Sequence, residues 1–260
     1  MIKILQYSFY DLVRSRWSYV YFLFYLVLGF ALLFLNSNVS KSIITLMNII
    51  IVLTPMIGTI FGVMYFYSSR EFTELLLAQP IKRSTIFLGQ YLGVAFSLTL
   101  SLVLGLGIPF MIYGIAQSDE VWNFGLLLLS GTFLTFIFVA VAANIALQHE
   151  NKIKGFGYAI FIWLFMAVIY DGLFLISLMV LDDYPLDKFS LLATMFNPID
   201  LSRILILLKL DISALLGYTG AVFQKFFGTN TGMFTSIGIL LIWCAVPVYF
   251  IKRISAKKDF

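Results

Sequence analysis

This 260-residue chain lacks the clustered side chains that catalysis or metal binding requires. Its single histidine, His149, is followed by Glu150, but the second histidine of a His-Glu-x-x-His zinc motif is missing. A Walker-type phosphate loop needs a Gly-Lys pair, and none occurs in the sequence. The sequence therefore predicts no catalytic residue, no metal site and no cofactor bound by this chain itself.

One ionisable residue, Asp171, lies well inside an apolar stretch, within Tyr170-Asp171-Gly172. A charge at membrane depth is costly and is usually kept for a function. The carboxylate could line a passage, respond to a substrate, or pair with a donor on another helix. A hydrogen bond to a serine, a tyrosine or the backbone of a neighbouring helix is the simplest structural interpretation.

The elements that must position these residues follow from composition. The chain is 61% hydrophobic and 12% charged, and its mean hydropathy is +0.99, so the lipid bilayer is its expected environment. Its basic residues are scattered between apolar stretches, so no nucleic-acid partner is expected. Open strands would leave backbone groups unpaired in lipid, which predicts an all-α integral membrane protein. Six stretches are long enough to span the bilayer as helices: residues 18–35, 43–67, 85–113, 124–147, 156–181 and 231–251.

The basic residues also predict the orientation of these spans. Most of the 17 lysines and arginines fall in the N-terminal segment, the second and fourth connections and the C-terminus. Short connections rich in Lys and Arg stay on the cytoplasmic side. Both termini are therefore expected in the cytoplasm.

Two shorter patterns predict helix packing. Ile2, Leu5 and Phe9 recur at helical spacing in the N-terminal segment, together with Leu12, which predicts an interfacial helix before the first span. Gly58-Thr59-Ile60-Phe61-Gly62 has the spacing that lets two helices approach closely, so the second span could face a second copy or another helix of the same chain.

The connection between the second and third spans predicts a short helix. Ser68 and Glu71 have capping-box spacing, Pro80 stops the helix, and Ser84 could cap the third span. An apolar knob flanked by charges suits docking in a groove of a soluble partner, although the leucines could instead rest on the membrane surface. The candidate docking residues are Arg70, Glu71, Phe72, Glu74, Leu75, Leu76 and Leu77.

The outer connection, residues 182–230, is too long to be a plain loop and should be folded. Asp200 could cap a helix that carries Leu201, Ile204, Leu205 and Leu208 on one face. Residues 218–228 form a second amphipathic piece. Together they predict a re-entrant or interfacial hairpin.

Three stretches carry a resemblance to a known family: residues 69–80, 196–203 and 210–221. With the order of the elements, they make the chain similar to the ABC-2 family of permeases. The resemblance covers nearly the whole chain and implies a single transmembrane domain, residues 1–260. It is strongest to the branch of the family that serves maturation of the copper centres of nitrous oxide reductase, where the work is tied to the supply of sulfur or copper.

That resemblance implies a non-catalytic subunit of the bacterial inner membrane. It implies a second copy of the chain, two cytoplasmic ATP-binding subunits that use ATP and Mg²⁺, and a periplasmic accessory protein of β-helix type. The ATP-binding subunits would dock on residues 70–79. The residues implied to contact the periplasmic partner are Asn197, Pro198, Asp200, Arg203, Asp211, Phe223 and Phe227.

Other functions stay open at this point. An ABC-2 exporter of a lipid, haem or drug would have the same architecture. An ion-coupled carrier would use Asp171 as its midplane charge. A membrane enzyme has the least support, because the sequence offers no nucleophile, base or metal cluster.

Overall fold

The computed structural model describes residues 1–36, 38–180, 187–209 and 230–257, and within these ranges all regular structure is helical. The predicted all-α fold with six apolar spans is confirmed. Each predicted span lies within a few residues of an observed helix, and most helices extend into polar residues beyond the apolar run. The spans are α2 (Arg16–Leu35), α3 (Val39–Ser68), α5 (Arg83–Ile112), α6 (Val121–Gln148), the combined α7 and α8 (Lys152–Val180), and α12 (Asn230–Lys257).

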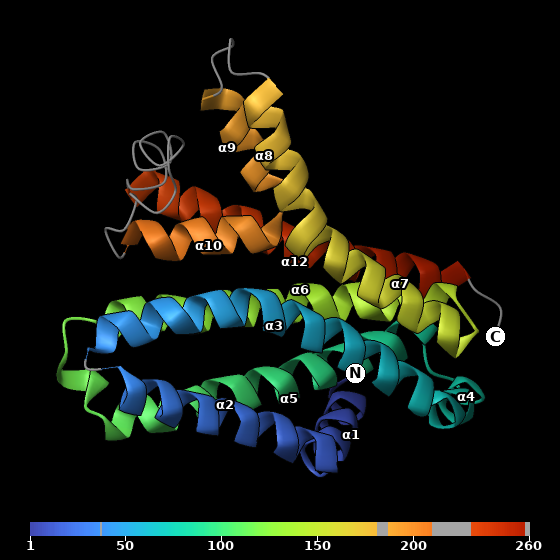
Figure 1. The fold of residues 1–260 in the computed structure, drawn as a ribbon. Helices are drawn as coiled ribbons and strands as arrows, with labels where there is room; N and C mark the ends of the chain where they lie inside the picture. Colours follow the sequence, from blue (N-terminus) through green and yellow to red (C-terminus); the bar gives the residue numbers. More distant parts are fainter. Residues whose placement is uncertain (37, 181–186, 210–229, 258–260) are drawn as a thin grey trace.

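Helix α6 forms the centre of the bundle, where it packs against α3, α5 and α12 (Figure 1). Gly58 and Gly62 of α3 face this helix. A Cβ on Gly62 would lie 2.6 Å from the Cβ of Ala142, and one on Gly58 would lie 3.3 Å from the Cβ of Phe138. The small-residue pair therefore packs within the chain, the second of the two alternatives that the sequence left open.

The N-terminal segment is helical, as predicted, and its buried face overlaps the predicted one only in part: Leu12 is buried, and Leu5 and Phe9 are half-buried. Helix α1 (Ile2–Val13) lies against α5 and buries Ile4, Ser8 and Leu12, whereas Ile2 is exposed. The side chains of Ile4 and Ser8 sit against two glycines of α5, Gly89 and Gly93. The contact is close because neither glycine has a side chain. This close contact determines which face of α1 is buried, and hydrophobic periodicity does not reveal it.

The fifth span is one helix interrupted by a wider turn. Helix α7 (Lys152–Leu164) passes into the π-helical turn η2 (Phe165–Ile169), and α8 (Tyr170–Val180) continues from it. Only 11% of this span is buried within the chain, compared with 67% of α6. Figure 1 shows α8 leaning away from the other spans. This span therefore has a much smaller packed face within the chain than α6.

The outer connection contains two helices that meet at a sharp bend. Helices α9 (Asp187–Met195) and α10 (Pro198–Lys209) turn by 112° over the residues between them. Helix α9 was not predicted, and the predicted piece at residues 218–228 lies outside the described residues. We call α9 and α10 the bent pair.

Helix α10 is buried on more sides than its amphipathic pattern predicted. It packs against α3, α6 and α12, so Ser202, which is not part of the predicted apolar face, is fully buried together with Leu201 and Leu207. An interfacial helix would keep one polar side in contact with water. The polar side that the amphipathic pattern predicted for α10 is therefore packed inside the protein at Ser202.

Candidate functional site

The short helix after the second span is present, but its ends differ from the prediction. Helix α4 comprises Arg70–Leu77. Ser68 still belongs to α3, where its hydroxyl donates to the carbonyl of Tyr65, and Ser69 occupies the N-cap without a side-chain bond. The predicted capping box at Ser68 is therefore wrong, because α3 continues up to the residue before the turn.

The predicted cap of the third span is also wrong. Helix α5 begins at Arg83, with Lys82 at its N-cap, so Ser84 lies inside the helix. The connection after α4 is tight, because the amide of Ile81 bonds to the carbonyl of Gln79. This short turn brings the chain into helical geometry before it reaches Ser84.

The inner face of α4 is attached to two other helices and to the apolar core. The buried side chain of Gln90 on α5 donates to the hydroxyl of Thr73, 2.7 Å away. The ring of Phe72 stacks on Tyr7 of α1 at a centroid distance of 4.2 Å, and Leu77 packs on the main apolar core. Movement of α4 therefore displaces α1 and α5 as well.

The outer face of α4 is exposed. Leu75 is 69% exposed, and Glu71 and Glu74 are also exposed. Arg70 and Glu74 form an i,i+4 ion pair with an N–O distance of 3.1 Å. The docking residues predicted from sequence thus divide into an outward group (Arg70, Glu71, Glu74, Leu75) and an inward group (Phe72, Leu77), with Leu76 partly buried.

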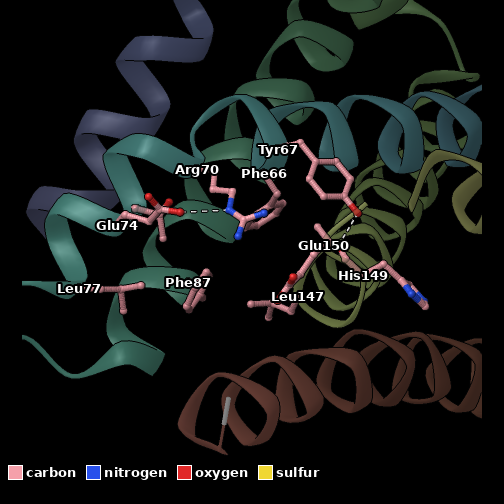
Figure 2. Close-up of a pocket in the computed structure, with 11 residues that line it drawn as sticks. Phe66, Tyr67, Arg70, Glu74, Leu77, Phe87, Leu147, His149 and Glu150 are labelled. Atoms are coloured by element: carbon pink, nitrogen blue, oxygen red, sulfur yellow. Dashed lines mark hydrogen bonds and ion pairs between the residues drawn. The ribbon is translucent and has the colours of Figure 1, made fainter. Parts of the chain in front are cut away.

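A small cavity separates α4 from the end of α6 (Figure 2). Its volume is about 60 Å³, too small for a nucleotide, since ligand pockets usually measure several hundred cubic ångströms. Arg70 and Glu74 line one side, and His149 and Glu150 line the other. The cavity marks the junction between two predicted cytoplasmic connections.

Tyr67 bridges this junction. Its hydroxyl donates to the carbonyl of His149, 2.6 Å away, and its ring lies against Gly155 of α7, where a side chain would clash. His149 is the residue that ends α6, and its ring stacks on Tyr158 of α7. The end of α3, helix α4 and the start of the fifth span therefore form one connected unit.

In the second half of the fifth span, Asp171 pairs with a donor on another helix, one of the three roles that the sequence left open. The carboxylate lies 2.8 Å from the guanidinium of Arg203 on α10, and Asp200 contacts the same guanidinium at 3.3 Å. The side chains of Arg203 and Asp171 are 28% and 29% exposed. We call Asp171, Arg203 and Asp200 the charged triad.

Asn197, not Asp200, caps α10. Its Oδ1 accepts from the amide of Ile199, whereas Asp200 lies in the first turn of the helix and accepts from the Asn197 amide at 2.8 Å. The prediction for Asp200 was wrong because Pro198 takes the first helical position, which suits proline, and so places the cap at residue 197.

The π-helical turn supplies a carbonyl to the same asparagine. Asn197 Nδ2 donates to the carbonyl of Met166 at 2.8 Å. The carbonyls at the end of α9 are bonded similarly: Tyr170 donates to Ala193 at 2.6 Å, and Trp243 of α12 donates to Met195 at 3.0 Å. Side chains from the fifth and sixth spans therefore hold the bend of the bent pair in place.

Three of the residues proposed to contact a periplasmic partner, Asn197, Pro198 and Asp200, are buried. Asn197 is fully buried and Asp200 is 7% exposed, so in this conformation both stabilise the bend. Asp211, Phe223 and Phe227 lie outside the described residues. Sequence reasoning missed Tyr170 and Trp243, although a buried Tyr or Trp usually needs a partner for its polar atom.

Known proteins are similar to this chain over both α4 and the bent pair. A family model described as ABC-2 family transporter protein matches residues 35–254. The chain belongs to the ABC-2 family. The match includes α4, the π-helical turn and the bent pair, whereas α1 and nearly all of α2 precede it. ABC-2 permeases are multi-pass membrane subunits that associate with ATP-binding subunits.

Two curated relatives extend the similarity over most of this ABC-2 permease. One is the probable ABC transporter permease protein NosY of Stutzerimonas stutzeri, 26% identical over 254 aligned positions that cover 92% of this chain and 85% of that protein. The other is the probable ABC transporter permease protein NosY of Pseudomonas aeruginosa, 24% identical over 221 positions that cover 78% and 80%. Both carry the permease description that the family predicts.

Proposed function

We propose that this permease receives the ATP-driven movement of a cytoplasmic ATP-binding subunit through α4. The observation that supports this most directly is the division of α4 into an exposed charged face and a face bonded to the rest of the chain. Leu75 and Glu74 would enter a groove of the partner, and the Arg70–Glu74 ion pair would present a fixed charge pattern beside them. Two such subunits would act on a pair of permeases.

The movement would then reach the outer side through two linked steps. Rotation of α4 shifts the end of α3, and Tyr67 passes that shift to the start of α7 through the carbonyl of His149. At the far end of the same span, Asp171 is paired with Arg203, so a displacement of α8 also moves the bent pair. The proposed path therefore consists of the Tyr67–His149 hydrogen bond, the lightly packed fifth span and the Asp171–Arg203 ion pair.

On the outer side, the bent pair and the chain that follows it would engage a periplasmic protein of β-helix type. We propose that the complex serves the assembly of the copper centres of nitrous oxide reductase, through the supply of sulfur or copper. The sequence resemblance and the names of both relatives support this function. Export of a lipid, haem or drug is the alternative that the family allows.

The ion-coupled alternative has less support than the ABC-2 role. Asp171 is held by Arg203 at 2.8 Å, which gives this charge within the span a structural partner and removes the need for a coupling ion to explain it. Gradient-driven uptake into liposomes that contain this chain alone, and its loss in Asp171→Asn, would instead support a carrier.

Docking on α4 can be tested with charge and polarity changes on its outer face. We expect Glu74→Arg combined with Leu75→Asp to reduce transport-coupled ATP hydrolysis by about tenfold or more, because the partner groove then meets a reversed charge and a buried carboxylate. The measurement is ATPase activity of the complex with the co-expressed ATP-binding subunit, in lipid nanodiscs.

Asp119→Arg is the matched control, since this exposed acid lies in the turn before α6, at the end of the bundle away from α4. It should leave coupling unchanged. Full coupling in the α4 double variant would contradict the docking assignment.

The cellular role needs a separate experiment. In a host that lacks this protein, nitrous oxide reductase should accumulate without its copper centres, and the wild-type gene should restore them. A reductase that retains its full copper content would favour the exporter alternative.

A further inference from the structure

A groove runs between α7 and α12 near the end of the bundle that carries α4, and α6 forms its floor. Two adjoining cavities, of about 490 and 590 Å³, make up this groove. They share Gln148, His149 and Phe250. The groove lies beside the fifth and sixth spans, of which only 11% and 22% is buried within the chain.

The part nearer the middle of the bundle is apolar and open at the side. Ile145 and Ile162 line it from α6 and α7, and Val246 lines it from α12. Val246 and Phe250 are 46% and 44% exposed, on a face that lipid surrounds in a membrane protein. A hydrocarbon chain from the bilayer could enter this part sideways without displacing any helix.

The floor of the groove is fixed by a polar contact. Asn144 of α6 donates from Nδ2 to the carbonyl of Pro247 on α12, 2.8 Å away, and to Ala140 of its own helix. The asparagine is 9% exposed. This bond sets the spacing of α6 and α12, so the groove is already formed before a ligand arrives.

The other part of the groove is basic. Arg253 and Lys257 line it from the last turns of α12, and both are exposed. The described residues that line either cavity include no carboxylate. The end of the groove that the basic residues predict to be cytoplasmic therefore offers two cations directly beyond an apolar channel.

We propose that this groove binds an anionic phospholipid of the cytoplasmic leaflet. The phosphate lies between Arg253 and Lys257, and one acyl chain follows the apolar walls past Ile162 and Val246. Basic pockets between transmembrane helices on the cytoplasmic side favour such head groups. The lipid supplies to the fifth and sixth spans the packing that the chain itself does not provide, independently of what the transporter moves.

Charge complementarity and shape both favour a lipid over other occupants. A soluble anion would use the two cations but leave the apolar channel empty. A second copy would have to place an acidic side chain and an apolar ridge in the same narrow space. A phospholipid has an anionic head group joined to apolar chains, which matches the basic end of the groove and the apolar part next to it.

The test is lipid retention by the complex of the permease with its ATP-binding subunit. After extraction in mild detergent, native mass spectrometry should detect one bound phosphatidylglycerol or cardiolipin per permease, in excess over phosphatidylethanolamine. In Arg253→Gln combined with Lys257→Gln, we expect retention to fall by about tenfold, because each cation near an anionic surface contributes severalfold to affinity. Val246→Trp should lower retention by filling the channel.

Lys252→Gln is the matched control, since this lysine is exposed on the same helix but does not line the groove. It should retain the lipid at the wild-type level, and glycerol phosphate, which lacks acyl chains, should not displace it. Equal loss in the control, unchanged retention in the double variant, or displacement by glycerol phosphate would each overturn the proposal. Absence of any bound phospholipid from the wild-type complex would overturn it as well.

Discussion

Replacing Arg203 by glutamine is expected to destabilise the permease by about 3 kcal/mol, because it leaves the charged triad without its only cation. Removing one partner of a buried ion pair costs about 3–5 kcal/mol, and we use the lower end because solvent reaches part of both side chains. The loss should loosen the bent pair from α8. Thermal unfolding of the detergent-solubilised protein measures the effect.

A double-mutant cycle separates the ion pair from general damage. Asp171→Asn alone should cost less than Arg203→Gln, since Asp200 still pairs with the arginine. The combination of both changes should be more stable than Arg203→Gln alone, because one uncompensated carboxylate has been removed. Additive losses in the double variant would show that Asp171 and Arg203 are not coupled.

Replacing Gly93 by leucine is expected to displace α1 from α5. A Cβ at this position would lie 2.6 Å from the Cβ of Ser8 and 3.0 Å from backbone atoms of Leu5 and Phe9, which cannot move without the helix. Overpacking of this kind costs about 1–3 kcal/mol. Because Tyr7 of α1 also stacks on Phe72, the displacement should reach α4 and lower coupled ATP hydrolysis.

Gly107→Leu is the matched control for this change. Gly107 lies in the same helix α5, and a Cβ there would meet no atom within 4 Å. Proteolysis of the N-terminal segment and ATPase activity of the complex can be compared between the two variants. Similar defects in both would show that α5 does not tolerate leucine in general, and would contradict a specific contact between Gly93 and α1.

The spans, α4 and α10 could be predicted from the sequence because each follows from a local property. Apolar runs of membrane length must be helical in lipid, and Pro80 ends α4 by removing a backbone donor. Local signals also predicted a short helix in this connection, although α4 begins and ends at other residues than predicted. These features depend on neighbouring residues alone, so a single sequence contains the information.

The remaining features depend on contacts between distant segments. Nothing in residues 165–169 distinguishes a π-helical turn from an α-helical one until Asn197 is placed beside Met166. The pairing of Asp171 with Arg203 likewise joins two spans through a bend that hydropathy does not register. Even the buried face of α1 depends on two glycines about 85 residues further along the chain.

The π-helical turn has a consequence for how insertions and deletions would act on this protein. A π-turn closes its hydrogen bonds one residue later than an α-turn, so it accommodates about one extra residue without rotating the helix beyond it. Losing one residue from 165–169 would leave Asp171 pointing at Arg203 but would remove the spare carbonyl that Asn197 uses. Mutations can therefore separate the two attachments of the bent pair. The Asp171–Arg203 ion pair depends on the register of α8, whereas the hydrogen bond from Asn197 to Met166 depends on the one extra residue in the π-helical turn.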